Sequence, residues 1–332
     1  MNKDTVLIVT SSQEIAAVKV IENLQKINQS FFRIDTDLFF SKNTGISMRL
    51  DGTSINRLVE RRSGEKLDLN QVKSIWFRRP QDIEVIGCNN EQERRFVQDE
   101  LTSALWSLYT SIDGVYWMNH PTASRHLLER NKFLQMKHAL KAGLIVPDTL
   151  ITNQAEQLIR FCEDHGGTIA VKTICSKMFS KPGEETAEGI YTNKISTEYI
   201  KEHSVEISLS PIMAQEYVEK ALEFRVTIVG NEIFACAIHS QDSERTKEDW
   251  RHYDFEKVKH EAYEFPAEVK NKLRAFMKRC GLSFGAVDMI LTPKGEFVFL
   301  EVNPSGQFGW IESLTGLPIS ETIAKTLSNP PE

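Results

Sequence analysis

The sequence predicts an α/β (α+β) protein, with an open, largely parallel N-terminal sheet followed by two smaller α+β units. At 332 residues the chain is longer than one ordinary domain, which favours two or three packed units. Apolar strands alternate with amphipathic helices over the first third, and apolar strands joined by short turns fill the last third. We therefore expect three domains, at residues 1–118, 119–211 and 212–332.

The first domain shows the strand and helix alternation of an open parallel sheet. Its first apolar run, Thr5–Thr10, has the pattern of a buried strand. No GxGxxG sequence follows this run, so the fingerprint of a dinucleotide site is missing. Further strands are expected at residues 31–34, 46–50 and 74–77, and helices at residues 14–28 and 91–112.

The second and third domains mix helices with hairpins. Gly230-Asn231 between two apolar runs predicts a two-residue hairpin turn, and Lys294-Gly295 lies in the turn of a second hairpin. The polar segment 176–183 has no periodicity and predicts a mobile loop. Helices are expected at residues 126–141 and 269–280, and strands at residues 168–173, 212–218, 224–229, 232–238, 284–291 and 297–302.

Composition and charge exclude several classes of function. The formal net charge of −6 argues against a nucleic-acid binder, and no apolar stretch approaches the length of a membrane span. The five cysteines are scattered without a CxxC pair, which favours reduced thiols in a cytosol over a disulfide framework. We therefore expect a soluble, cytoplasmic protein with neither a nucleic-acid partner nor a membrane partner.

The last hairpin carries the strongest chemical signal. Asp288 and Glu301 are symmetric about its turn, so an even-length loop places them opposite each other on one face. Asn303, two residues beyond Glu301, points to the same face. Their apolar neighbours have the pattern of buried strands, where two facing carboxylates are costly without a cation. We expect these three side chains to bind Mg²⁺, and prefer this to the alternative of exposed surface carboxylates.

Other charged residues are less specific when taken singly. Glu223 and Arg225 share a strand face, where an Arg can clamp a phosphoryl group; a simple ion pair is the alternative, slightly favoured. Lys172 ends an apolar strand, which is unusual unless it meets an anion, whereas Lys132 alone is typical of a solvated helix. The strand Gln215-Glu216-Tyr217-Val218 can present its backbone to an adenine edge, but this signal is weak.

Taken in order, these residues resemble the ATP-grasp superfamily. The resemblance runs from about Asn119 to the C-terminus and implies a nucleotide enclosed between two small sheets, with ATP and Mg²⁺ as cofactors. It also implies that Glu219 meets the ribose and that Arg225, as the catalytic residue, meets the γ-phosphate. The other implied nucleotide contacts are Lys132, Lys172, Gln215, Glu216, Tyr217, Val218 and Glu223, and the implied metal ligands are Asp288, Glu301 and Asn303.

Within the superfamily, three segments resemble the graspetide (microviridin-type) peptide macrocyclases. These segments are Trp76-Phe77-Arg78-Arg79-Pro80, Trp117-Met118-Asn119-His120-Pro121 and Asp249-Trp250-Arg251. Arg78 and Arg79 at a strand end suit an acidic substrate side chain, with a surface ion pair as the alternative, and Arg251 is expected to serve the same purpose. The resemblance implies a ribosomally made precursor peptide, with leader and core, as the partner; a homodimer stays open.

The implied reaction joins Asp or Glu side chains of the peptide, activated by ATP as acyl phosphates, to Ser or Thr hydroxyls (ester) or Lys amines (amide). The loop 176–183 is expected to close over the phosphates and exclude water. One alternative is an amino-acid or glutamate-tailing ligase of the same superfamily. Another is a non-catalytic nucleotide-binding protein that binds a peptide, against which the presence of Asp288, Glu301 and Asn303 together argues.

Overall fold

The computed structural model describes residues 3–39, 44–52, 55–61, 63–122, 131–174, 178–179, 188–189, 192–247, 249–252, 254 and 256–331. The chain forms two compact units, one of Met1–His120 with Pro318–Glu332 and one of Pro121–Leu317. This division differs from the three expected domains, because the expected boundary at residue 212 lies inside the second unit. The C-terminal residues belong to the first unit because helix α9 (Ile319–Ser328) packs against α1 (Ile15–Lys26).

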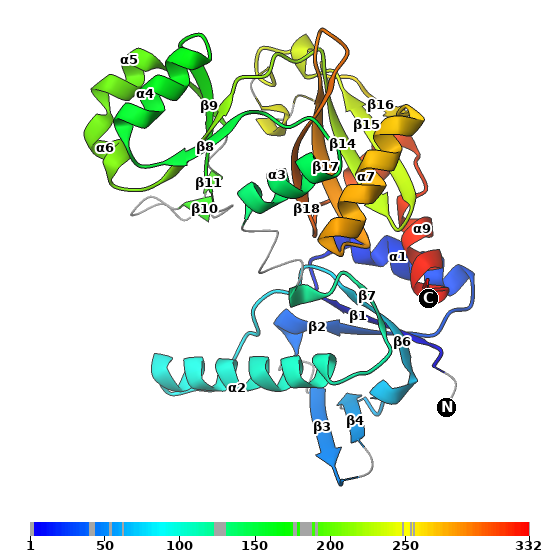
Figure 1. Ribbon diagram of the computed structural model, residues 1–332. Helices are drawn as coiled ribbons and strands as arrows, with labels where there is room; N and C mark the ends of the chain where they lie inside the picture. The colour runs from blue at the N-terminus through cyan, green and yellow to red at the C-terminus, as the bar shows by residue number, and fades with distance from the viewer. Residues whose placement is uncertain are drawn as a thin grey trace. The chain divides into compact units, whose positions relative to one another are not determined.

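The first unit is built on a parallel sheet with the strand order β2-β1-β6-β7, as expected (Figure 1). Besides α1 and α9, this unit contains β1 (Thr5–Thr10), β2 (Phe31–Asp35), β3 (Thr44–Leu50), β4 (Ile55–Arg61), β5 (Lys66–Asp68), β6 (Val72–Phe77), α2 (Glu91–Thr110) and β7 (Tyr116–Met118). Strand β1 is buried along its whole length, which explains its continuous apolar sequence. Leu7 and Val9 of β1 share one core with Leu105 and Leu108 of α2.

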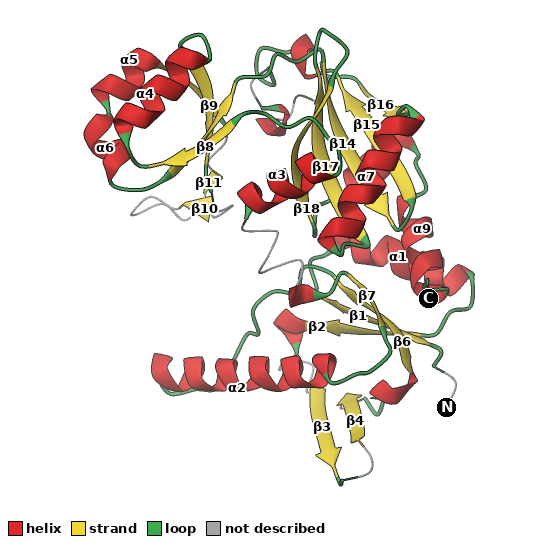
Figure 2. Cartoon of the chain, viewed as in Figure 1, coloured by secondary structure: helices red, strands yellow, loops and turns green. Residues whose placement is uncertain are grey.

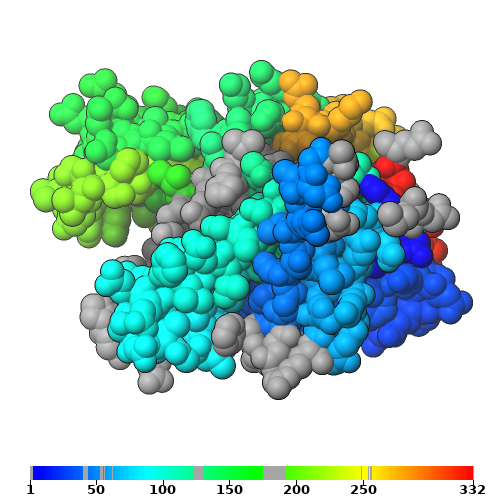
Figure 3. Space-filling model, turned by 90° about the horizontal axis from the view of Figure 1, so that it is seen from below, coloured from blue at the N-terminus to red at the C-terminus, as the bar shows by residue number. Residues whose placement is uncertain are grey.

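The expected strand at residues 46–50 forms, but it belongs to a different sheet. It lies in β3, which pairs with β4 and β5 in a separate antiparallel sheet of the first unit. Helix α2 turns only part of its length towards the core: Leu108 is fully buried, whereas Phe96 is 65% exposed. The outer surfaces of α2 (cyan) and of the β3–β4 hairpin (blue) are visible in Figure 3.

Among its described residues, the second unit contains two larger antiparallel sheets (Figure 2) and the two-stranded antiparallel sheet β10-β11. The smaller sheet, β12-β9-β13-β8, is covered by α4, α5 and α6, and the larger sheet, β16-β15-β14-β17-β18, is covered by α3 and α7. The helices are α3 (Lys132–Lys141), α4 (Ala155–Asp164), α5 (Thr197–Glu202), α6 (Ser204–Ser208), α7 (Ala267–Cys280) and α8 (Gly309–Thr315). The strands are β8 (Thr149–Thr152), β9 (Thr168–Lys172), β10 (Met178–Phe179), β11 (Glu188–Gly189), β12 (Asn193–Ser196), β13 (Ile212–Glu216), β14 (Leu222–Val229), β15 (Glu232–Ile238), β16 (His260–Tyr263), β17 (Phe284–Leu291) and β18 (Phe297–Asn303).

Side chains of the larger sheet alternate between two faces. Phe224 and Val226 of β14 and Met289 of β17 join the apolar core that α3 and α7 complete. The intervening residues, Arg225 and Asp288 among them, point to the opposite face, which is therefore the polar one.

The turn at Gly230-Asn231 is confirmed, because Val229 pairs directly with Glu232. Of the expected loop 176–183, only Met178–Phe179 falls within the described residues, where it forms β10. Residues 126–130 of the expected helix 126–141 also lie outside the described residues, and α3 begins at Lys132. Within the described part of the chain, none of the helices has the length and apolar character that a membrane crossing requires.

Candidate active site

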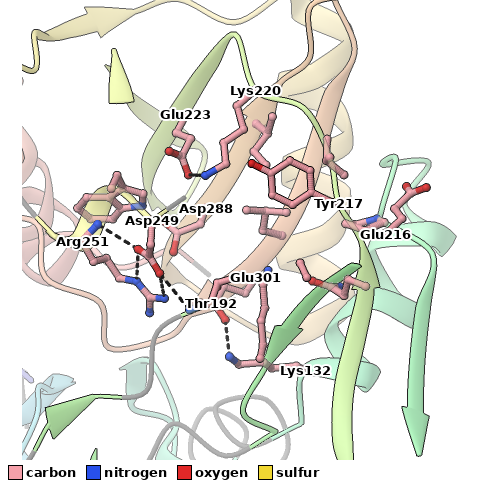
Figure 4. Close-up of a pocket in the computed structure, with 18 of the residues that line it drawn as sticks. Lys132, Thr192, Glu216, Tyr217, Lys220, Glu223, Asp249, Arg251, Asp288 and Glu301 are labelled. Carbon is pink, nitrogen blue, oxygen red and sulfur yellow. Dashed lines mark hydrogen bonds and ion pairs between the residues drawn. The ribbon is translucent and has the colours of Figure 1, made fainter. Parts of the chain in front are cut away.

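A pocket in the second unit is lined by residues from its four-stranded and its five-stranded sheet (Figure 4). The lining residues are Lys132, Pro147, Ala170, Lys172, Thr173, Thr192, Gln215, Glu216, Tyr217, Val218, Lys220, Glu223, Asp249, Trp250, Arg251, Asp288, Ile290, Leu300 and Glu301. Most of the charged residues that the sequence singled out are therefore brought to one place, although they are spread over much of the chain.

A row of charged side chains crosses the larger sheet beside this pocket. Backbone pairing places Arg225 opposite Asp288, and Asp288 opposite Glu301. Arg225 Nη1 donates to both carboxylate oxygens of Asp288, at 3.0 and 3.1 Å. At the other end of the row, Glu301 Oε2 lies 3.0 Å from Lys132 Nζ. Two carboxylates therefore face each other with one cation at each end.

The pairing of Asp288 with Glu301 is confirmed, but the predicted reason for it is wrong. Closer to the turn, Met289 pairs with Phe299, which leaves an odd number of residues between the partners. A β-bulge at Leu300 adds one residue and so brings Glu301 opposite Asp288. As a consequence, Leu300 and Glu301 both line the pocket although they are neighbours in sequence.

Helix α3 places Lys132 by docking on strand β18. Gln135 Nε2 donates to Val302 O, and Val302 N donates to Gln135 Oε1, both at 3.0 Å. The Gln135 amide thus forms the same pair of hydrogen bonds with β18 that the backbone of a neighbouring strand would form. Lys132 lies one turn earlier on the same face of the helix. Asn131 caps the helix, its side chain accepting from Leu134 N at 3.0 Å. The Lys132 contact with Glu301 therefore follows from the fixed position of the helix.

Burial and neighbouring charges shift the pKa values of the two facing carboxyls in opposite directions. Burial raises the pKa of Asp288; Arg225 opposes this rise, and the nearby charge of Glu301 adds to it. Burial also acts to raise the pKa of Glu301, but Lys132 and Lys172 outweigh it and lower that pKa to about 2. Glu301 is thus the firmly ionised member of the pair at neutral pH.

Lys172 ends strand β9, opposite Met213 of β13. Burial lowers the pKa of Lys172 to about 8; the attraction of Glu301 opposes this, and the repulsion of Lys132 and Arg251 adds to it. A lysine held in this way among other cations gains strongly from a bound anion. The sequence-based expectation that Lys172 meets an anion therefore has a physical basis in the pocket.

Two further ion pairs line the pocket (Figure 4). Arg251 Nε donates to Asp249 Oδ1 at 2.8 Å, and the second oxygen of Asp249 accepts from Thr192 N at 3.4 Å. Lys220 Nζ lies 3.1 Å from Glu223 Oε1, and both side chains are buried. Sequence reasoning assigned roles to Arg251 and Glu223 but none to their partners. Both partners could have been found from the sequence, because each carries a charge opposite to that of Arg251 or Glu223 and lies within three residues of it.

Three predicted site residues of the second unit, Arg225, Asn303 and Glu219, lie outside the pocket lining. Asn303 pairs with Ala286 across the sheet and is exposed, and its Oδ1 accepts from Ser305 N at 2.9 Å. Glu219 is exposed as well. The metal role of Asn303 and the ribose role of Glu219 stay predictions.

Arg78 and Arg79 belong to the first unit and share one carboxylate there. Arg78 is 1% exposed, with its Nη2 3.3 Å from Glu14 Oε1. The Arg79 side chain is 44% exposed, with its Nε 3.8 Å from Glu14 Oε2. The ion pair considered from the sequence is therefore present, although Arg78 makes it in the interior. Only Arg79 is open to a ligand in this arrangement.

The carboxylates of the pocket fit a divalent cation shared with an anionic ligand. Among the described residues, no group of three or more His, Cys, Asp or Glu side chains is placed to hold a metal alone. Asp288 and Glu301 supply two facing carboxylates, and Mg²⁺ commonly takes one or two carboxylates with phosphate and water oxygens. Lys132 and Lys172 supply positive charge for such phosphates. The residues present therefore suit Mg²⁺ bound together with a nucleotide.

Comparison with known proteins identifies the family. Residues 5–125 match the MvdD pre-ATP grasp domain, and residues 129–327, more than half of the chain, match the RimK-like ATP-grasp domain. The chain belongs to the RimK-like ATP-grasp family. The ATP-grasp fold expected from the sequence is thereby confirmed.

Several solved structures resemble this chain over nearly its full length. A RiPP-associated ATP-grasp ligase from Chryseobacterium gregarium, solved with ADP and a leader and core peptide, has a TM-score of 0.88 at 27% identity; the match covers 100% of this chain and 98% of that one. The macrocyclase MdnC from Microcystis aeruginosa MRC, bound with precursor peptide MdnA, has a TM-score of 0.82 at 28% identity, with 98% and 99% covered.

The macrocyclase MdnB from the same organism has a TM-score of 0.76 at 29% identity, again with 98% and 99% covered. A search of curated protein sequences gives no significant match. The resemblance to microviridin-type macrocyclases that the sequence indicated is confirmed by these structures.

Proposed function

We propose that this RimK-like ATP-grasp protein is an ATP- and Mg²⁺-dependent ligase that closes rings in a ribosomally made precursor peptide. The observation that carries the proposal is the facing pair Asp288 and Glu301, ion-paired at its ends to Arg225 and Lys132 beside the pocket. Two like charges face each other in this row, and a divalent cation bound between them would offset their mutual repulsion.

The pocket residues divide into three groups by the part of the ligand they suit. The segment Gln215-Glu216-Tyr217-Val218 lines the side where its backbone can hold the adenine. Lys132 and Lys172 suit the phosphates, and Asp288 and Glu301 suit the metal. Bound Mg²⁺ would neutralise charge on the phosphate oxygens and so favour phosphoryl transfer. Glu223 holds Lys220 in the wall of the pocket.

The chemistry asked of the protein is mainly positioning and charge stabilisation. A substrate Asp or Glu carboxylate, ionised at neutral pH, attacks the γ-phosphorus of ATP, which forms an acyl phosphate and releases ADP. Arg225 stabilises the charge on the transferred phosphoryl group. A Ser or Thr hydroxyl or a Lys amine then attacks the acyl carbon, expels phosphate and loses a proton. The net change in the peptide is the loss of one water per bond.

The precursor peptide as partner is supported by the relatives solved with leader, core or precursor peptides. Arg79 and Arg251 are proposed to receive acidic side chains of the peptide, because bidentate hydrogen bonding suits carboxylates. We place the reaction in the cytoplasm, where ATP and newly made peptide are both available. The free thiols of Cys162, Cys236 and Cys280 support a reducing compartment.

The test is mass spectrometry of the precursor peptide after incubation with the protein, ATP and Mg²⁺. We expect successive losses of water with wild-type protein and none with Asp288→Asn, because the metal site then loses one carboxylate. Incubation with free amino acids and ATP distinguishes the tailing ligase, which would add mass instead. Full activity of Asp288→Asn would remove the metal assignment, and absence of ATP-dependent mass loss with a matched peptide would remove the proposed function.

A further inference from the structure

The segment that follows strand β18 places a glycine, Gly306, against Arg225 at one end of the charged row. Gly306 is buried, and its N donates to Asn303 O at 3.1 Å, which closes a turn at the strand end. A methyl group added at Gly306 would lie 2.3 Å from Ala286 Cβ and 2.7 Å from Arg225 Nη2. Both distances are far below van der Waals contact between non-bonded heavy atoms. The space above Arg225 therefore exists only because residue 306 has no side chain.

The two nearest neighbours of the added methyl group are Ala286 and Arg225, and the backbone oxygen of Asn303 follows at 3.3 Å. Ala286 lies in β17, where it pairs with Thr227 on one side and Asn303 on the other, so it cannot withdraw. Arg225 is 8% exposed and is held by both oxygens of Asp288. The guanidinium, at the end of a flexible side chain, can yield to the second contact, whereas the contact with Ala286 is relieved only by a shift of residue 306 itself.

We propose that Gly306 is a positioning residue, whose missing side chain leaves the space in which the Arg225 guanidinium lies against Asp288. The kinetic consequence rests on the proposed function, in which Arg225 stabilises the transferred phosphoryl group. The positional consequence does not, since it follows from the packing of Gly306, Ala286 and Arg225 alone. Gly306 touches no substrate and acts through Arg225.

The test replaces Gly306 with Ala and measures phosphate release with ATP, Mg²⁺ and the precursor peptide. A displacement of about 1 Å at a catalytic group can cost roughly 100-fold in rate, and we expect a loss of this order in kcat. The KM for ATP stays near the wild-type value, because an interaction made in the transition state is lost. The matched control is Gly309→Ala in the same segment, where an added Cβ meets nothing within 4 Å, and it keeps the wild-type kcat.

A second variant separates the contact with Arg225 from the contact with the strand. In Gly306→Ala with Ala286→Gly, the closest clash is removed and the thermal stability returns towards wild type, while the 2.7 Å approach to Arg225 persists. We expect kcat to stay low in this double variant. Recovery of the wild-type kcat would assign the effect to the strand contact and overturn the proposal.

An Arg225→Ala background gives the complementary test. If Gly306 acts through Arg225, Gly306→Ala lowers kcat no further there, whereas a second loss of full size would show a separate role and overturn the proposal. A crystal structure of Gly306→Ala gives an outcome that does not depend on activity: we expect the guanidinium to be displaced from Asp288. An unmoved guanidinium refutes the proposal. Wild-type protein that releases no phosphate refutes the proposed function instead, and the crystal structure then decides the role of Gly306.

Discussion

We expect Glu301→Gln to destabilise the ligand-free protein as well as to stop the reaction. Against the effect of burial, Lys132 and Lys172 lower the pKa of Glu301 from 4.5 to about 2. At about 1.4 kcal/mol for each pKa unit, this difference corresponds to about 3 kcal/mol of folding stability at pH 7. Gln keeps the shape of the side chain but carries no charge, so the variant lacks this contribution to the folding stability.

The same effect has a pH dependence of known sign. Because the folded-state pKa of Glu301 is depressed, its contribution is complete above the unfolded value of 4.5 and is lost as the pH falls towards 2. At pH 3 the gap between wild type and variant should therefore shrink to roughly half. Urea unfolding followed by tryptophan fluorescence at pH 7 and pH 3 measures both values.

The control is Glu296→Gln, an exposed carboxylate on the same hairpin, which should change stability by less than about 0.5 kcal/mol. The electrostatic reasoning would be refuted by a Glu301→Gln variant that is as stable as wild type at pH 7. It would also be refuted by a difference in unfolding free energy that does not change with pH. Full ligase activity of the variant would refute its assignment to the metal.

Two further predictions address other charged groups. With a Lys172 pKa of about 8, binding of MgADP at pH 8 should take up about half a proton, because the phosphates raise that pKa again. Calorimetry in buffers of different ionisation enthalpy measures this uptake, Lys172→Met should abolish it, and its absence in wild type would contradict the prediction. Arg78→Ala should cost about 3–5 kcal/mol, since it removes the cation that lies 3.3 Å from the buried Glu14 carboxylate, whereas Arg79 lies 3.8 Å away. Arg79→Ala, at an exposed side chain, should cost less than about 1 kcal/mol. Urea unfolding of both variants measures the two losses, and equal losses would refute the distinction.

Local patterns in the sequence were sufficient for much of the fold. Strand β1 has the predicted bounds, and the turn at Gly230-Asn231 joins the predicted strands, because side-chain period and turn chemistry act over a few residues. Part of the candidate site could be predicted from the sequence for the same reason. Asp288 and Glu301 lie on one hairpin, and Lys172 ends a recognisable apolar strand.

What the sequence analysis missed depends on packing between distant elements. Phe299 and Val302 both join the core, and two residues three positions apart can share a strand face only if a bulge lies between them. Counting positions from the turn instead gives the right pair of residues for the wrong reason. The expected third domain, 212–332, includes the residues of helix α9, and nothing in their own sequence indicates that they pack against α1.

The two ion pairs of the charged row affect how a nucleotide and a metal would bind. Lys132 is paired with Glu301 and Arg225 with Asp288, so a nucleotide can recruit these cations only if the carboxylates find another partner. Mg²⁺ is such a partner, and nucleotide and metal should therefore bind cooperatively, each raising the affinity for the other by about tenfold or more. Calorimetric titration of ADP with and without Mg²⁺ measures the coupling, and Asp288→Asn should reduce it. Equal ADP affinity in the two titrations would mean that the cations are free to meet the phosphates without any exchange of partners.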